Sequence, residues 1–247
     1  VVGVMIRALL NCVFGLALAA SMAKAQAEIV IDRTRLIYPA TARGVTLNLR
    51  NEADSPRLVQ VWIDEGDPQM APELSDVPFT VTPPILRMDP GKAQALRVIY
   101  HPVPRQAITD PQEVVYWLNV LGIRPTDAAS HQLQLAFRTR IKLFLRPNAL
   151  PGRAEDAVAA LQWQLADDRP VLRVRNPSAF HVTLSSVVLN LEGVEYRHEN
   201  PPMLAPRSTA ELIIPGWVVP WRGTPTLRFT TLDDYGATHE RTQRIGR

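Results

Sequence analysis

The sequence predicts an all-β protein made of two domains of short strands. Apolar and polar residues alternate over many short segments, and 22 prolines interrupt the chain. Long stretches with the 3.6-residue period of a helix are scarce, which favours strands joined by turns. A length of 247 residues fits two ordinary domains, and an apolar fraction of 46% is normal for a protein that buries a core.

Residues 1–27 have the composition of a secretory signal peptide. Arg7 precedes a short apolar run at 8–20, and small residues two apart follow it. Cleavage after Ala25 and cleavage after Ala27 fit equally well. The run is too short for a comfortable membrane span, and an uncleaved anchor helix is the alternative. We therefore expect a periplasmic protein without stable membrane insertion.

The chain that remains after cleavage has a nearly balanced charge and no cysteine. The formal charge is +3, and it falls to +1 without Arg7 and Lys24, because 25 basic residues then face 24 acidic ones. No run of five or more basic residues suggests a nucleic-acid partner. Cys12 is the only cysteine, so a mature chain that begins near Glu28 has no disulfide, no thiolate metal site and no cysteine nucleophile.

The first series of predicted strands lies between residues 28 and 147. Alternating or apolar segments occupy 45–49, 59–63, 95–100 and 114–121. The turn at 89–92 contains Pro and Gly and precedes the third of them. These segments predict one sandwich-sized domain over 28–147.

Residues 133–145 form the longest alternating segment. Odd positions are apolar from Leu133 to Leu145, except for Thr139, and even positions are mostly polar or basic. Side chains alternate across a strand, so one face carries a ladder of large apolar groups. On a sheet edge such a strand invites pairing with another chain. The pattern alone also allows an interior strand whose odd face fills the core.

A segment at 147–152, with two prolines and a glycine, looks like a linker. We expect a second domain over 148–247. A helical piece at 154–161, or only a turn, comes first. The predicted strands that follow are 161–165, 171–174, 182–191, 210–214 and 226–230. Each half has about 100 residues, the size of one immunoglobulin-like sandwich.

Six segments, taken together, are distinctive. Residues 140–147 read RIKLFLRP, and the other segments are 32–39, 79–87, 90–91, 113–119 and 233–236. In their order along the sequence they resemble the signature of periplasmic pilus-assembly chaperones of the chaperone–usher pathway, across almost the whole mature chain. The resemblance implies two immunoglobulin-like β-sandwich domains at an angle with an interdomain cleft. It also implies a chaperone that completes pilus subunits by donating a β-strand.

The resemblance implies roles for individual residues. Arg35 and Lys142 match the two cations that bind the C-terminal carboxylate of the subunit, and charge-assisted hydrogen bonds suit such an anion. Arg33 is the nearest alternative to Arg35. Solvated surface charges are the alternative for any of these cations.

Two further groups follow from the same resemblance. The donor strand would present Leu133, Leu135 and Phe137, with Ile141 as a further candidate. An ionic network that fixes the angle between the domains would consist of Glu113, Arg146 and Asp234. Without the resemblance, these three residues would be unrelated surface charges.

The resemblance also indicates a subtype and a working cycle. The segment before the donor strand, 123–131, is short, as in the short-loop branch of the family. Leu145 and Asp233 replace a usual tyrosine and asparagine, which leaves the subfamily open. The implied partners are pilus subunits, in a 1:1 complex, and an outer-membrane usher that receives them, with no cofactor and no ATP.

The sequence is also compatible with two other classes of protein, an enzyme and a secreted pilus component. The five histidines are scattered and form no metal motif, and neither a nucleophile elbow nor a phosphate loop is present, so we expect no enzyme. The second alternative is a secreted two-domain β-sandwich that acts as a binding or structural pilus component. A structural subunit would form fibres, whereas a chaperone would bind a separate subunit.

Overall fold

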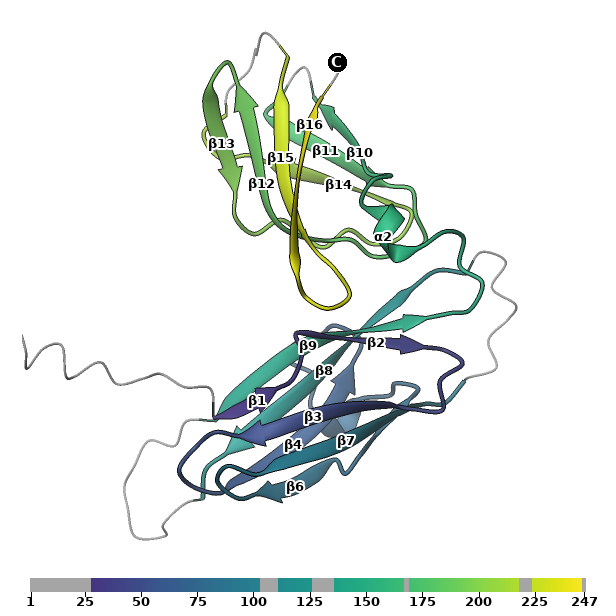
Figure 1. Cartoon of the computed structure of the whole chain (residues 1–247), viewed down its shortest axis with the longest axis vertical. Coiled ribbons are helices and arrows are strands. Elements are labelled where there is room, and N and C mark those ends of the chain that lie inside the picture. The colour runs from purple at the N-terminus through teal and green to yellow at the C-terminus, as the bar shows by residue number, and fades with distance from the viewer. Residues whose placement is uncertain (1–27, 103–110, 126–135, 167–168, 218–223, 246–247) are drawn as a thin grey trace, which may run out of the picture.

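The computed structural model describes residues 28–102, 111–125, 136–166, 169–217 and 224–245. In these ranges the chain forms two β-sandwiches, each with its own core (Figure 1). The predicted all-β, two-sandwich fold is confirmed. The predicted signal peptide at 1–27 and the donor candidates Leu133 and Leu135 lie outside the described ranges.

The N-terminal domain packs a four-stranded sheet against a five-stranded one. The first sheet has the order β1 (Ile29–Ile31), β3 (Val45–Asn51), β7 (Ala93–Tyr100) and β5 (Phe79–Thr82). The second has the order β2 (Arg35–Pro39), β9 (Phe137–Arg146), β8 (Val114–Ile123), β4 (Arg57–Asp64) and β6 (Ile85–Met88). A short 3₁₀ helix, η1 (Pro72–Leu74), follows β4.

The C-terminal domain repeats this architecture on a smaller scale. Its sheets are three-stranded and four-stranded. The first has the order β10 (Gln162–Leu165), β11 (Val171–Asn176) and β14 (Ser208–Ile213). The second has the order β13 (Val194–His198), β12 (Thr183–Leu191), β15 (Thr226–Leu232) and β16 (Thr238–Arg244).

The start of the first domain contributes to both of its sheets. β1 pairs antiparallel with β3, and β2, four residues further along, pairs parallel with β9. The first of these strands is held by Glu28, whose buried carboxylate accepts a hydrogen bond from buried Arg57 at 2.8 Å. This crossing from one sheet to the other brings β2 to the side of the domain that faces its neighbour.

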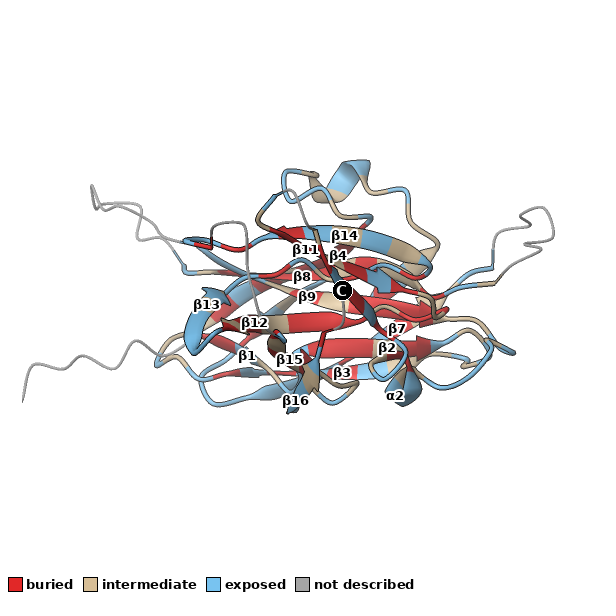
Figure 2. Ribbon diagram, turned by 90° about the horizontal axis from the view of Figure 1, so that it is seen from above, coloured by how far each residue is buried: buried red, intermediate tan, exposed pale blue. Residues whose placement is uncertain are grey.

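Alternating side chains explain the two cores. In β3, Leu47 and Leu49 point inward while Thr46 and Asn48 are exposed, as expected for a strand with one buried face. Figure 2 shows the buried residues along the middle of the strands and the exposed ones at the loops and edges. Each domain can therefore fold around its own apolar interior.

The segment between the domains differs in part from the expectation. The helical piece predicted at 154–161 is the four-residue helix α2 (Ala154–Ala157), followed by a turn, and Leu161 already packs in the C-terminal core. The predicted boundary after Pro147 falls between β9 and α2 and stays a prediction. Figure 1 shows the two sandwiches joined on one side, with the turn between β15 and β16 directed at the N-terminal domain.

Candidate functional site

Two cations from different strands lie side by side at the surface of the N-terminal domain that faces its neighbour. Arg35 is the first residue of β2, and it is the register partner of Lys142 on β9. Neighbouring residues in one row of a sheet project their side chains on the same face. The two predicted anchor residues are thus brought together although 107 positions separate them in the sequence.

Arg35 connects the two domains. Its side chain is 7% exposed, and its Nη1 donates to the Thr183 hydroxyl at 3.4 Å and to the Leu232 carbonyl at 3.3 Å. Its buried Nε has no hydrogen-bond partner. Burial lowers the pKa of Arg35, although the carboxylates of the nearby turn oppose this effect. A guanidinium held in this way keeps donor capacity for an anion.

Lys142 is the second cation, and it is half-buried. Its Nζ lies 5.6 Å from the centre of the Trp117 ring. Burial, together with repulsion from Arg35, lowers the pKa of Lys142 to about 8. Within the ranges that the structure describes, neither Lys142 nor Arg35 has a carboxylate at ion-pair distance. The pair therefore carries positive charge that a bound anion would neutralise.

The strand that carries Lys142 has an open edge. β2 covers β9 only from Lys142 to Arg146, whereas β8 pairs with it from Phe137 to Leu145. From Phe137 to Ile141, no strand among those described occupies the other side of β9. The unpaired backbone groups of such an edge can accept a further strand.

Phe137 and Ile141 lie on the same face of β9 but in different surroundings. Phe137 is 59% exposed, whereas Ile141 is 6% exposed and belongs to the core of the N-terminal domain. The apolar face of the strand thus passes from the interior to the open edge. Of the four predicted donor residues, Phe137 is the one that the structure describes as accessible.

The three residues predicted as an ionic network are in contact. Arg146 donates from Nε to Glu113 at 2.9 Å and from Nη1 and Nη2 to Asp234 at 2.7 and 3.0 Å. Burial alone would lower the pKa of Arg146, but its hydrogen bonds to Asp234 and Glu113 raise it. Because Asp234 belongs to the other domain, the network crosses the interface.

A fourth member of this network, His181, was missed by the sequence reasoning. Its backbone N–H donates to Glu113 at 2.9 Å, and its Nδ1 lies 3.0 Å from the same carboxylate oxygen. Glu113 is 2% exposed. One of its carboxylate oxygens accepts from Arg146 and the other contacts His181. Nothing in the local sequence around His181 distinguishes it from the other histidines.

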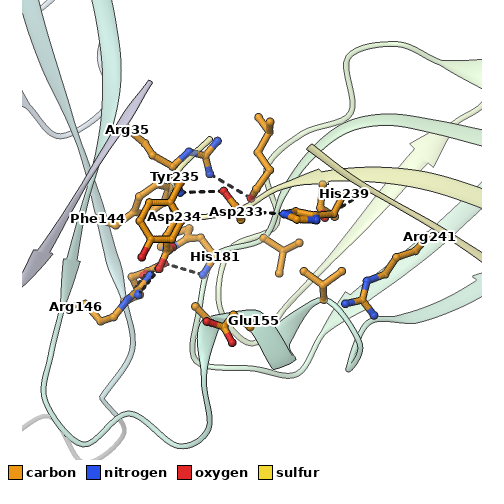
Figure 3. Close-up of a pocket in the computed structure, with 16 residues that line it drawn as sticks. Arg35, Phe144, Arg146, Glu155, His181, Asp233, Asp234, Tyr235, His239 and Arg241 are labelled. Carbon is orange, nitrogen blue, oxygen red and sulfur yellow. Dashed lines mark hydrogen bonds and ion pairs between the residues drawn. The ribbon is translucent and has the colours of Figure 1, made fainter. Parts of the chain in front are cut away.

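A cavity of about 370 Å³ lies between the domains, lined by both. Figure 3 shows Arg35 and Arg146 directed from the N-terminal domain toward the turn that carries Asp233 and Asp234. Asp233 holds this turn by accepting hydrogen bonds from the backbone N–H groups of Tyr235 and Ala237, both at 2.9 Å. The predicted cleft is therefore present, and it contains one of the two anchor cations.

The turn fits closely against the first domain. Gly236 has φ +85°, and a Cβ added there would overlap the hydroxyl of Thr34. A glycine is required on both counts, because other residues rarely adopt this conformation and would collide with the segment between β1 and β2.

No cluster of three or more His, Cys, Asp or Glu side chains in the described part of the chain is arranged to hold a metal ion. Across those residues, no helix has the length and apolar character to cross a membrane.

The comparisons with known proteins agree with this geometry. Residues 28–151 match the family model described as pili and flagellar-assembly chaperone, PapD N-terminal domain, and residues 156–243 match pili assembly chaperone PapD, C-terminal domain. The chaperone protein FimB/FhaD of Bordetella pertussis is 38% identical over 227 residues, which cover 90% of each chain.

Two solved structures extend the comparison. The crystal structure of the YadV chaperone is 35% identical, with a TM-score of 0.77, and the match covers 89% of this chain and all of that one. The SafB chaperone of Salmonella enterica, solved in complex with the SafA pilin, is 25% identical, with a TM-score of 0.72 over 90% of this chain and 99% of that one. Since both domain models match in order and together span most of the sequence, the chain belongs to the family of PapD-like pilus-assembly chaperones.

Proposed function

We propose that this protein is a periplasmic chaperone that captures pilus subunits by donor-strand complementation and delivers them to an outer-membrane usher. The observation that carries the proposal is the pair Arg35 and Lys142, two half-buried or buried cations in register on neighbouring strands that repel each other. The chain end of a subunit is a suitable ligand, because a carboxylate has two oxygens and can accept from both side chains.

The open edge of β9 supports the second half of the mechanism. A subunit strand placed along Phe137 to Ile141 would extend the five-stranded sheet through backbone hydrogen bonds. Phe137, which is exposed in the free chaperone, would then enter the apolar groove of the subunit. Leu133 and Leu135 continue the same alternation in the sequence and are the further donor residues of the proposal; Ile141 is already used by the core.

The network of Glu113, Arg146 and Asp234 supports a fixed angle between the domains. Arg146 is bonded to Glu113 of its own domain at 2.9 Å, and its bonds of 2.7 and 3.0 Å to Asp234 cross the interface. We propose that it keeps the cleft open at the width that the subunit needs. The family is one of chaperones rather than enzymes, and no catalytic step is part of the proposal.

Co-expression with a pilus subunit tests the anchor. Replacing Lys142 by Ala should reduce co-purification of the subunit at least about tenfold, because a hydrogen bond to a charged group is lost. The melting temperature should not fall, since the charge of Lys142 is already disfavoured by burial and by Arg35. Lys92→Ala, at an exposed lysine of the same domain, is the matched control. Capture by Lys142→Ala at the wild-type level would contradict the assignment.

The periplasmic location has its own test. Osmotic-shock fractionation should release a chain whose N-terminus, read by Edman sequencing, lies near Glu28. A mature chain that still carries Arg7 would contradict the location.

A further inference from the structure

Three cations occupy the same face of β9 at even spacing. Arg138, Arg140 and Lys142 occupy even positions of the strand, opposite the face of Phe137, Ile141 and Leu143, so all three project away from the core. Only Lys142 has Arg35 beside it. Adjacent same-face positions lie about 7 Å apart, and a carboxylate could therefore also find two cations between Lys142 and Arg140.

This spacing creates a problem of register. A subunit strand that slips by one residue turns its apolar side chains to the wrong face, and burial opposes the slip. A slip of two residues keeps every side chain on its correct face. The apolar ladder therefore discriminates weakly against a two-residue slip, and the position of the carboxylate has to set the register.

Asp64 removes the competing site. It is the last residue of β4, it is 2% exposed, and it forms an ion pair with Nη2 of Arg140. The oxygen that pairs with Arg140, Oδ1, also accepts from the backbone N–H of Gly66 at 2.7 Å, and the other oxygen, Oδ2, accepts from Asn119 at 2.6 Å. The charge of Arg140 is thus neutralised by a carboxylate that is itself fixed.

The Trp117 ring lies between the two sites. The Arg140 guanidinium stacks over it with Cζ 4.3 Å from the ring centre, and Lys142 approaches the same ring. Asp64, Trp117, Lys142 and Arg35 form one continuous row across four strands. Arg140 is therefore held away from an incoming anion, toward Asp64, while Lys142 remains available.

Arg138 offers no equivalent second site. Its Nη2 donates to the Pro68 carbonyl at 2.7 Å, and its guanidinium lies 5.9 Å from the centre of the Trp62 ring. Its neighbour along this face is Arg140, which Asp64 has already neutralised.

We propose that Asp64 determines the register of the captured subunit, by neutralising Arg140 and leaving Arg35 with Lys142 as the cation pair that receives the terminal carboxylate. This role rests on the proposed function. It adds a residue that does not touch the subunit and acts through Arg140.

The test compares the full-length wild type with Asp64→Asn and with the double variant Asp64→Asn/Arg140→Gln. Acetate is titrated into each protein while the Arg side-chain Nε signals are followed by NMR. In the wild type, acetate should shift Arg35 and leave Arg140 unchanged. In Asp64→Asn, Arg140 should respond as well. Asp89→Asn, which removes an exposed partner of Arg87, is the control.

A second arm reads the register itself. A cysteine is introduced at Thr139 of the chaperone and combined in turn with single cysteines at two positions of a pilus subunit that lie two residues apart, and disulfide cross-links are quantified. For Asp64→Asn, the cross-link that reports the two-residue slip should rise about tenfold over wild type. The double variant should return it to the wild-type level, because both charges are gone; a merely structural role for Asp64 would leave the double variant as defective as the single one.

The outcomes are separable. Cross-links in one register for Asp64→Asn, or a double variant without recovery, would overturn the proposal. So would an Arg140 signal that stays indifferent to acetate after Asp64→Asn. If the wild type captures no subunit, the proposed function fails, and the acetate titration still decides whether Asp64 shields Arg140. If Asp64→Asn does not fold, the test uses the double variant Asp64→Asn/Arg140→Gln and the single variant Arg140→Gln. Cross-links in a single register in both variants support the role of Asp64. Cross-links in the slipped register in Arg140→Gln overturn it.

Discussion

At the scale of single residues, the proposed anchor is a pair of cations, Arg35 and Lys142, whose charges are disfavoured by burial. Burying a charge without a partner is costly, and Arg35 is almost fully buried with one nitrogen unpartnered. The same unfavourable burial, together with repulsion from Arg35, appears at Lys142 as a lowered pKa. A carboxylate bound between the two cations would stabilise the charge of each. Part of the binding free energy would therefore come from removing an unfavourable interaction in the free chaperone.

The pH dependence of this site follows from the direction of the shift. In the folded chain the pKa of Lys142 is about 8, below its ordinary value of 10.5. The unfolded chain therefore binds more protons between these values, and stability rises with pH from about 8 to 10.5. Below pH 8 Lys142 is charged and ready to bind an anion, and above it the affinity falls.

NMR titration of the labelled Lys142 Cε measures this directly. We expect a midpoint near pH 8 in the free protein and a higher midpoint with a peptide that ends in a free carboxylate. The amidated peptide should leave it unchanged. A free-protein midpoint at the ordinary value would contradict the geometry of the pair.

At the scale of elements, β9 changes its surroundings along its length. Its last residues fill the core and pair on both sides, whereas among the described strands its first residues pair with β8 alone. The change occurs between Phe137 and Ile141, four positions apart on one face. Stability and capture should therefore separate along the strand.

Two alanine substitutions test this separation. Ile141→Ala should lower the free energy of unfolding by about 2–5 kcal/mol, because it leaves a cavity in a packed core. Phe137→Ala should lower it by less than about 1 kcal/mol, because the ring is largely exposed. Urea unfolding measures both.

Subunit capture should show the opposite order. Phe137→Ala should weaken it by at least about tenfold, through the loss of apolar area buried in the complex. Equal losses of stability for the two variants would show that Phe137 is structural as well.

The same division explains which elements the sequence predicts. Strands that pack against a core, such as β3 and β8, can be predicted from the sequence. Their apolar and polar residues alternate, or they form an apolar run. β16 cannot be predicted in this way, because its residues THERTQR are almost all exposed, and only its pairing with β15 makes it a strand. The strand conformation of β16 is therefore determined by tertiary pairing rather than by its local sequence pattern.

The same limit applies to the site. Arg35, Lys142 and Arg146 could be identified because they lie in recognisable segments. Asp64 and His181 could not, because each acquires its role from contacts with residues 68 or more positions away. Local pattern carries no information about such contacts.

At the scale of the whole molecule, the domains are tied by buried charge. Arg146 joins Glu113 of its own domain to Asp234 of the other. Apolar contact alone would allow the sandwiches to rotate, whereas fork-like hydrogen bonds fix direction as well as distance. This network is therefore the proposed determinant of the angle between the domains.

Replacing Arg146 by Ala should destabilise the protein by about 3–5 kcal/mol, because it leaves Glu113 buried without its cation. Small-angle X-ray scattering should also show a broader range of interdomain distances. Arg153→Ala removes an exposed pair with Glu155 and should cost less than about 1 kcal/mol. A scattering profile for Arg146→Ala that matches wild type would assign the angle to other contacts.

The docking of the Asp233–Gly236 turn against Thr34 has a consequence for the order in which the protein becomes competent. The partners of Arg35 and Arg146 on that side, Leu232 and Asp234, lie close to the C-terminal end of the sequence. If the chain is exported N-terminus first, as the proposed periplasmic location implies, β9 is complete long before Arg35 and Arg146 meet these partners. We therefore expect full capture of a subunit only after the hairpin of β15 and β16 has docked on the N-terminal domain.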